Sequence, residues 1–233
     1  MPPVAILAGG LATRLYPVTQ SIPKSLVQVA GKPFIEHQLN LLRAKGVARV
    51  VLCAGHLGDQ IKFAIGDGKR FGISVDYSFD GEMSLGTGGA VKKALPMLGD
   101  LFFVMYGDSY LDIDFSSVHG YFMAGDRNGV MTVFRNRDRW GKSNVVFEEG
   151  VVSCYDKTAG TSGLEYIDYG LSLLRGSCFE SFKDGTCFDL GDVYRRLILC
   201  RQMSGIEVME RFYEIGSVSG LEETGKYLRR KLS

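Results

Sequence analysis

The sequence lacks the features that mark several protein classes. It has no C-x-x-C pair and its three histidines are scattered, so no zinc site of the usual spacing is indicated. No apolar run approaches the roughly 18 residues that a membrane-spanning helix requires. Its 27 basic residues against 26 acidic ones leave no excess charge that would attract a polyanion in bulk. We therefore expect neither nucleic acid nor a membrane as a partner, and any bound polyanion must be held locally.

The cysteine pattern and the absence of linkers predict the compartment and the domain count. The five cysteines are odd in number and several lie in apolar surroundings, which favours a reduced protein. Met1-Pro2-Pro3 leads directly into an apolar segment, so we expect no leader peptide and a cytoplasmic location. No proline-rich, serine-rich or charged linker divides the 233 residues, and we therefore expect one domain over residues 1–233.

The most informative stretch is L-A-G-G-L-A-T-R-L-Y-P-V-T-Q-S-I-P-K-S-L, residues 7–26. An apolar strand over residues 4–7 ends at Gly9-Gly10, where backbone N–H groups can approach a ligand closely. Phosphate groups are the usual ligands of such loops. Arg14 and Lys24 then supply a planar and a compact cation. Together these residues predict a grip for a nucleoside triphosphate.

Two better-known phosphate motifs do not fit. A dinucleotide fingerprint needs a third glycine, and Gly9-Gly10-Leu11-Ala12-Thr13-Arg14 has none. A Walker loop is nearly matched by N-R-D-R-W-G-K-S, residues 136–143, but its first glycine is Asn136 and an apolar strand follows where a helix is required. Both motifs are rejected.

Strands and helices alternate in the first half of the chain. Apolar strands are expected at residues 4–7, 49–53, 73–77 and 101–106, with helices at 33–45 and 57–65 and a third after the glycine-rich loop 80–89. This alternation predicts an α/β fold with a doubly wound sheet whose ligands collect at the carboxyl ends of the strands. Beyond residue 129, closely spaced strands at 130–134, 145–147, 151–155 and 166–174 indicate a partly antiparallel region. A helix at 190–199 capped by Asp189, a strand at 207–215 and a closing helix at 221–232 complete the prediction.

One carboxylate stands out by position. Asp108 follows the very apolar strand 101–106, which places it at the carboxyl edge of a central strand. Oxygen ligands of this kind suit magnesium, so Asp108 is the best candidate to hold Mg²⁺ near the triphosphate. The alternative is that Asp108 caps the following turn. Asp112 and Asp114 are interpreted as a turn residue and a helix N-cap before Phe115.

A family resemblance rests on these and further motifs. G-G-x-x-T-R-L-x-P-x-T, P-K-x-L, G-K-P-F-I and L-G-T-G-G-A are followed in order by Gly107-Asp108, D-R-W-G, Asp156-Lys157 and Gly170. This series resembles the sugar-1-phosphate nucleotidyltransferases, and within them the heptose-1-phosphate guanylyltransferases and short uridylyltransferases. The resemblance implies a Rossmann-like, mixed, three-layer sandwich of the nucleotidyltransferase and GT-A-like type. It also implies a nucleotide-binding half, residues 1–128, and a sugar-phosphate-binding half, residues 129–233.

The resemblance also assigns roles on the nucleotide side. Arg14 is expected to grip the leaving phosphates and Lys24 to contact the α-phosphate, so that these two and Asp108 form the catalytic set. Gly86 and Thr87 are expected beside the base and ribose. The whole expected nucleotide site is Leu7, Ala8, Gly9, Gly10, Thr13, Arg14, Lys24, Gly86, Thr87 and Asp108.

On the acceptor side, the resemblance places the sugar phosphate at Trp140, Gly141, Asp156, Lys157, Asp168 and Gly170. Relatives often carry Asn at the position of Asp168 and Glu at that of Asp156, which leaves the sugar open. Trp140 is interpreted as a wall of the sugar pocket, with a core residue as the alternative, and Lys142 as a solvated cation. Glu214 occupies a position usually taken by Asp and is expected to be the second magnesium ligand beside Asp108. The alternative is that Glu214 has left the metal and pairs with a basic neighbour such as Arg211.

The expected reaction transfers a nucleotidyl group from a nucleoside triphosphate to a sugar 1-phosphate and releases pyrophosphate, with Mg²⁺ as cofactor and a monomer or small homo-oligomer as the active form. One alternative is a non-catalytic module that binds a sugar nucleotide and regulates a partner. Such a module would not need Arg14, Lys24, Asp108 and Lys157, and the presence of all four favours the enzyme. The other is a cytidylyltransferase that acts on phosphocholine, whose pocket would need aromatic and acidic groups around the quaternary ammonium.

Overall fold

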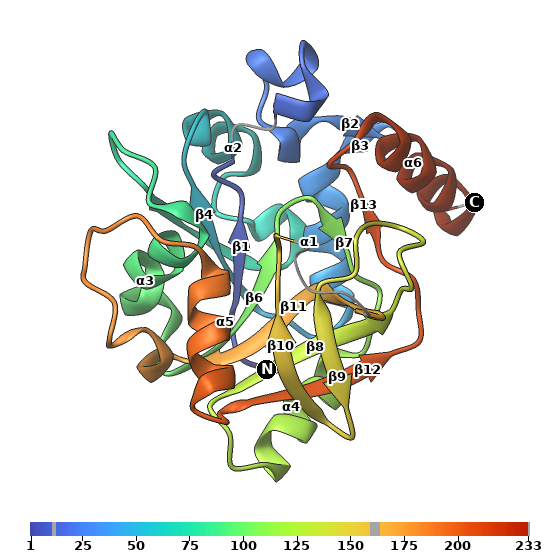
Figure 1. The fold of residues 1–233 in the computed structure, drawn as a ribbon. Coiled ribbons are helices and arrows are strands. Elements are labelled where there is room, and N and C mark those ends of the chain that lie inside the picture. The colour runs from blue at the N-terminus through green and yellow to red at the C-terminus, as the bar shows by residue number, and fades with distance from the viewer. Residues whose placement is uncertain (11–12, 159–163, 233) are drawn as a thin grey trace.

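The protein is described by a computed structural model over residues 1–10, 13–158 and 164–232. Its centre is a nine-stranded mixed sheet of order β5-β4-β1-β6-β11-β8-β12-β10-β9, which runs through both halves of the chain (Figure 1). Strands β5, β4, β1 and β6 are parallel, whereas β11 runs antiparallel to both β6 and β8. The fold is therefore the α/β, Rossmann-like, doubly wound mixed sheet that the sequence predicted.

The strands lie close to their expected positions. The sheet is built from β1 (Val4–Leu7), β4 (Arg49–Ala54), β5 (Ser74–Phe79), β6 (Leu101–Tyr106), β8 (Gly129–Arg135), β9 (Val145–Glu148), β10 (Val151–Tyr155), β11 (Tyr166–Arg175) and β12 (Met203–Val208). Two small pairs complete the strands, namely β2 (Gln28–Val29) with β3 (Lys32–Pro33), and β7 (Ser109–Tyr110) with β13 (Tyr213–Glu214).

The α-helices are α1 (Phe34–Ala44), α2 (Gly58–Ile65), α3 (Gly86–Leu98), α4 (Phe115–Ala124), α5 (Leu190–Leu199) and α6 (Val218–Leu232). Asp114 caps α4 by accepting the N–H of Ser116, and Asp189 caps α5 through a capping box with Asp192, as the sequence predicted for both caps. Asp112 pairs with Lys45 and Lys231 and so ties the last helix to the body of the protein.

The helices cover the two faces of the sheet and make three layers (Figure 1). Residues of β1 alternate between these faces, because successive side chains of a strand point to opposite sides. Val4 and Ile6 pack with α1, α2 and α4 in one core cluster, whereas Ala5 packs with α3 and α5 in the other. Helix α6 lies apart from both layers, against β2 and β13.

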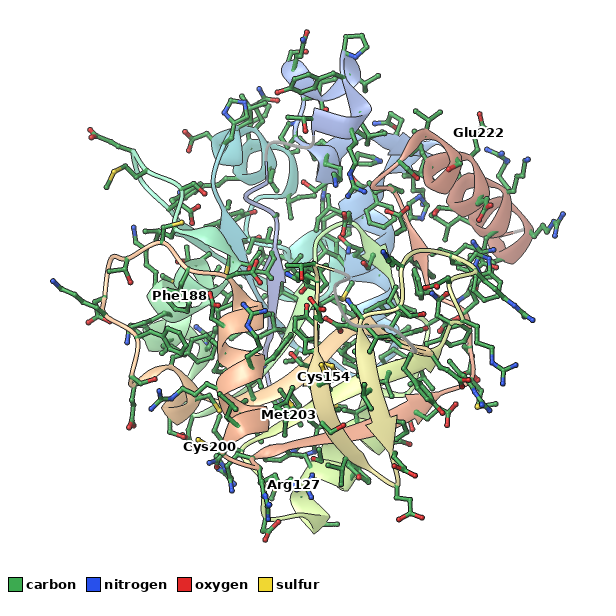
Figure 2. All side chains as sticks on the ribbon, viewed as in Figure 1. Arg127, Cys154, Phe188, Cys200, Met203 and Glu222 are labelled. Atoms are coloured by element: carbon green, nitrogen blue, oxygen red, sulfur yellow. The ribbon has the colours of Figure 1, made fainter. Side chains whose placement is uncertain are left out.

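Three boundaries differ from the sequence prediction. Helix α3 begins at Gly86, inside the expected loop, where the side chain of Phe188 lies beside it (Figure 2) and the carbonyl of Phe188 accepts the N–H of Gly88. The expected strand 207–215 is two strands, β12 and β13, which belong to different sheets. Helix α6 begins at residue 218, three residues early. Within the described residues, no helix is long and apolar enough to cross a membrane.

Candidate active site

A cavity of about 230 Å³ opens at the carboxyl ends of the four parallel strands. Residues that follow β1, β5 and β6 line it together with the start of α3 and the segment before β2. Its lining residues are Leu7, Ala8, Gly9, Gly10, Lys24, Ser25, Cys53, Asp80, Ser84, Gly86, Thr87, Ala90, Tyr106, Gly107 and Asp108. Most of the nucleotide site expected from the sequence is therefore gathered in one cavity, although Thr13 and Arg14 lie outside its lining.

The backbone turn after β6 packs directly against the end of β1. The N–H of Gly107 donates to the carbonyl of Leu7 at 3.0 Å, and a β-carbon on Gly107 would lie only 2.5 Å from that oxygen. A side chain at position 107 would therefore push the two strand ends apart. This glycine sets the position of the next residue, Asp108, at the edge of the cavity.

Asp108 forms an ion pair with Lys24 inside the site. The Nζ of Lys24 lies 2.9 Å from Oδ2 of Asp108, and both side chains are largely buried, with 19% and 27% of their surfaces exposed. Among the described residues, no backbone N–H donates to this carboxylate, and the hydroxyl of Ser109 donates to its Oδ1 over 3.5 Å, so its contacts favour the ion pair over a turn cap. The expected catalytic cation and the expected metal ligand are thus already in contact.

Glu214 reaches the same place from the other side. The register of β13 against β7 sets Glu214 opposite Ser109, next to Asp108. A β-carbon on Gly216 would overlap Oε2 of Glu214 and lie 3.3 Å from Oδ2 of Asp108 and 3.4 Å from Nη2 of Arg14. The two carboxylates and the Arg14 guanidinium therefore converge on Gly216, beyond the end of the cavity.

Glu214 also binds the two residues that lead into α6. Its Oε2 accepts the N–H of Gly216 at 2.5 Å and its Oε1 accepts the hydroxyl of Ser217 at 3.2 Å. Arg211, the basic neighbour named in the alternative, forms its ion pair with Glu223 instead. A carboxylate at a helix N-terminus is stabilised by the unpaired N–H groups there.

Asp189 connects a residue of the expected nucleotide site to a residue of the expected sugar-phosphate site. Its Oδ2 accepts the hydroxyl of Thr87 at 3.1 Å, and its Oδ1 accepts Nζ of Lys157 at 2.8 Å. Although desolvation raises the pKa of the Asp189 carboxyl, hydrogen bonds led by that from Lys157 hold it below its usual value. The expected nucleotide residue Thr87 and the expected sugar-phosphate residue Lys157 are therefore joined through one carboxylate.

Asp168 and Gly170 lie next to this connection, at an irregular point of β11. The N–H of Gly170 donates to Oδ1 of Asp168 at 3.0 Å, and a β-carbon on Gly170 would lie 3.4 Å from the ring of Tyr106, a residue of the cavity wall. Desolvation raises the pKa of the Asp168 carboxyl to about 6, with the Gly170 N–H and Lys157 acting in the opposite direction. Asp168, Gly170 and Lys157 thus share one neighbourhood beside the nucleotide cavity.

The raised pKa of Asp168 predicts a stability change with pH. Between the unfolded value of about 4 and the folded value of about 6, the folded state holds the extra proton, so stability falls as pH rises through this window. We expect Asp168→Asn to be more stable than the wild type at pH 8, by at most about 3 kcal/mol. The difference should disappear near pH 4. Melting temperatures of both proteins at pH 4, 6 and 8 test this, and a constant difference at all three values would contradict it.

The remaining acceptor residues lie outside the lining of the first cavity. Trp140 lines a second cavity of about 230 Å³ with Arg139, Arg211 and Tyr213, and the Arg211 guanidinium lies 4.6 Å from the centre of its ring. Asp156 accepts the N–H and hydroxyl of Thr158 in its own loop. The carbonyl of Gly141 accepts the side chain of Asn136. Lys142 is exposed, as expected.

Sequence reasoning missed three side chains of the site. Tyr106 and Asp80 each come at or just after the carboxyl end of a parallel strand, which is a signal that could have found them. Asp189 was identified only as a helix cap, because a local capping pattern does not reveal that the same carboxylate also binds Thr87 and Lys157 across the cleft.

Comparisons with known proteins agree with this geometry. The sequence profile of the family described as nucleotidyl transferase matches residues 4–144. The chain is 30% identical over 226 residues to the N-acetylmuramate alpha-1-phosphate uridylyltransferase of Neisseria meningitidis serogroup B, with 94% of each chain covered. It is 33% identical over 180 residues to the D-glycero-alpha-D-manno-heptose 1-phosphate guanylyltransferase of Campylobacter jejuni, covering 76% of this chain and 77% of that one. The crystal structure of HddC from Yersinia pseudotuberculosis superposes with a TM-score of 0.80 at 24% identity, covering 98% of this chain and all of that one.

Proposed function

Because this chain belongs to the nucleotidyl transferase family, we propose that its two-sided cleft joins a nucleoside triphosphate to a sugar 1-phosphate. The products are a sugar nucleotide and pyrophosphate. The proposal that the nucleotide and the sugar phosphate bind on opposite sides of Asp189 rests on one observation. Asp189 binds both Thr87, which lines the nucleotide cavity, and Lys157, which lies outside that cavity. A donor and an acceptor can therefore lie next to each other across this carboxylate.

The reaction is a displacement at phosphorus. An oxygen of the sugar phosphate forms a bond to the α-phosphorus, and the bond from that phosphorus to the bridging oxygen of pyrophosphate breaks. Several negative charges meet in this step, so positioning and charge compensation supply most of the rate enhancement. Lys24, inside the cavity, is proposed to meet the α-phosphate, and Arg14, outside its lining and near Gly216, is proposed to meet the leaving phosphates.

A magnesium ion fits the residues between these cations. Asp108 and Glu214 present two carboxylates around Gly216, and magnesium in phosphate-transfer sites is usually bound by one or two carboxylates plus phosphate oxygens and water. Within the described residues, no third His, Cys, Asp or Glu joins them, in keeping with such an open shell. The ion would neutralise charge on the phosphates. When it is bound, Asp108 would hold it and Lys24 would be released toward the nucleotide.

The decisive experiment is a matrix of five nucleoside triphosphates against a panel of hexose and heptose 1-phosphates, with magnesium, read as released pyrophosphate. We expect release that depends on both substrates. Phosphocholine with CTP is included as an acceptor of different chemistry, and turnover there alone would replace the sugar-phosphate assignment. No release with any pair would favour a regulatory module that only binds.

Lys157 is expected to serve the sugar phosphate. Since its ammonium group lies in the later half of the chain and only reaches the nucleotide cavity through Asp189, Lys157→Ala should raise the KM for the sugar 1-phosphate about tenfold to a hundredfold. The KM for the nucleotide should change little. Steady-state constants for both substrates measure this, with the exposed Lys142→Ala as the matched control. A defect confined to the nucleotide constant would refute the assignment.

A further inference from the structure

The order of strands shows which end of the nucleotide cavity lies at β5 and which at β6. Its lining runs from Asp80 after β5, through Cys53 of β4 and the segment after β1, to Asp108 after β6. Strands β5 and β6 are three strand spacings apart in this order, or roughly 14 Å. Lys24 sits at the β6 end, where the phosphates are assigned. The base of a bound nucleotide must therefore point toward β5 and Asp80.

Asp80 is a half-buried carboxylate that the protein leaves almost unused. Its Oδ2 accepts one long hydrogen bond, from the N–H of Leu85 at 3.4 Å, and lies 3.1 Å from where a β-carbon on Gly55 would be. Among the described residues, its Oδ1 accepts no hydrogen bond, and Lys93 binds the backbone carbonyl of Asp80 rather than the carboxylate. Burial raises the pKa of Asp80, so two good donors from a ligand would relieve its desolvation.

A carboxylate distinguishes sharply among the bases because it only accepts hydrogen bonds. Guanine presents two adjacent donors, N1–H and the N2 amino group, which match the two oxygens of a carboxylate. Uracil and thymine present one donor between two carbonyl oxygens, and these oxygens would face the carboxylate with like partial charge. Adenine and cytosine each offer one amino group beside an acceptor nitrogen. Guanine is thus the base that leaves no unpaired or repelling group at this position.

We propose that Asp80 recognises the Watson–Crick edge of guanine through N1–H and the N2 amino group, and so makes the protein selective for guanosine triphosphate. This inference rests on the proposed function of the same cavity. It names the nucleotide substrate. It also makes Asp80 a residue that determines base specificity, separate from the catalytic set of Arg14, Lys24 and Asp108.

Inosine triphosphate gives a first test, because it differs from GTP only in lacking the N2 amino group. In the wild type we expect kcat/KM for GTP to exceed that for ITP by about tenfold to a hundredfold, the effect of losing one base contact. In Asp80→Ala the two triphosphates should be used equally. A ratio near one in the wild type, or a ratio that survives in Asp80→Ala, overturns the proposal.

Asp80→Asn gives a second test, in which the variant should gain a preference for a different base. The amide keeps one acceptor for N1–H but offers a donor where the N2 amino group had bonded, which suits the O2 carbonyl of xanthine. We expect Asp80→Asn to prefer xanthosine triphosphate over GTP, the reverse of the wild type. Glu82→Gln is the matched control, since it removes an exposed carboxylate of the same loop outside the cavity lining and should keep the GTP preference.

Binding of GTP, ITP and UTP is measured by calorimetry without a sugar 1-phosphate. This measurement separates base recognition by Asp80 from the proposed nucleotidyl transfer. Tight binding of GTP with weak binding of ITP and UTP, lost in Asp80→Ala, supports base recognition by Asp80 even if pyrophosphate is never released. Pyrophosphate release with UTP or dTTP exceeding that with GTP refutes the guanine assignment and leaves nucleotidyl transfer standing.

Discussion

Lys24→Ala is expected to lower kcat by about 10²- to 10³-fold, the usual effect of removing one group that meets charge developing in a transition state. The ammonium of Lys24 lies in the nucleotide cavity 2.9 Å from Asp108, so it is already placed where negative charge will accumulate. Arg14→Ala is expected to have a similar effect, because Arg14 lies beside Asp108 and Glu214, at the end where we propose that pyrophosphate departs. Single-turnover rates with saturating substrates measure both.

The fold should survive both changes, although Lys24→Ala leaves Asp108 without its cation. Melting temperatures within a few degrees of the wild type would establish that the lost rate is chemical. Lys32→Ala serves as the control, since Lys32 is an exposed cation on the neighbouring β2–β3 pair. Near-normal turnover by either variant, with every triphosphate that the wild type accepts, would show that Lys24 or Arg14 does not bind the triphosphate as expected.

The sequence could predict the nucleotide side of the site because local patterns determine it. The apolar strands that end before Gly9 and Asp108 are both buried, and buried parallel strands joined by helices bring their carboxyl ends to one edge. Neighbouring pairs β1–β4 and β1–β6 then place these loops together without any knowledge of side-chain contacts. The same logic extends to Asp80, which follows β5 on the same edge.

The acceptor side could not be predicted in the same way. Asp168 and Gly170 lie at an irregularity of β11 between Asp168 and Ser172, and such a register shift leaves no periodic signal. The other expected acceptor residues lie in loops. Trp140 lines a second cavity because Arg211, which lies far along the chain, packs on its ring. The double use of Asp189 likewise depends on contacts across about a hundred residues of chain.

Asp108→Asn is expected to be as damaging as Lys24→Ala, with a loss in kcat of about 10²- to 10³-fold and a higher magnesium requirement. A neutral amide keeps the shape of the side chain but is a much poorer ligand for a hard divalent cation. It also removes the charge that holds Lys24 at 2.9 Å. Pyrophosphate release titrated with magnesium separates the two effects, because only loss of a ligand moves the midpoint of the titration.

Glu214→Gln tests whether the second carboxylate serves the metal, the helix or both. As a ligand, Glu214 should shift the magnesium midpoint upward when it is replaced. If Glu214 supports the start of α6, replacing it should lower the melting temperature, because its charge-assisted hydrogen bonds from Gly216 and Ser217 are weakened. Ser217→Ala separates these roles, because it removes a capping hydroxyl while leaving the carboxylate in place. We expect Ser217→Ala to lower the melting temperature without moving the magnesium midpoint, and Glu214→Gln to change both. An unchanged midpoint in Glu214→Gln would leave Asp108 as the sole protein carboxylate at the metal and assign Glu214 to α6 alone.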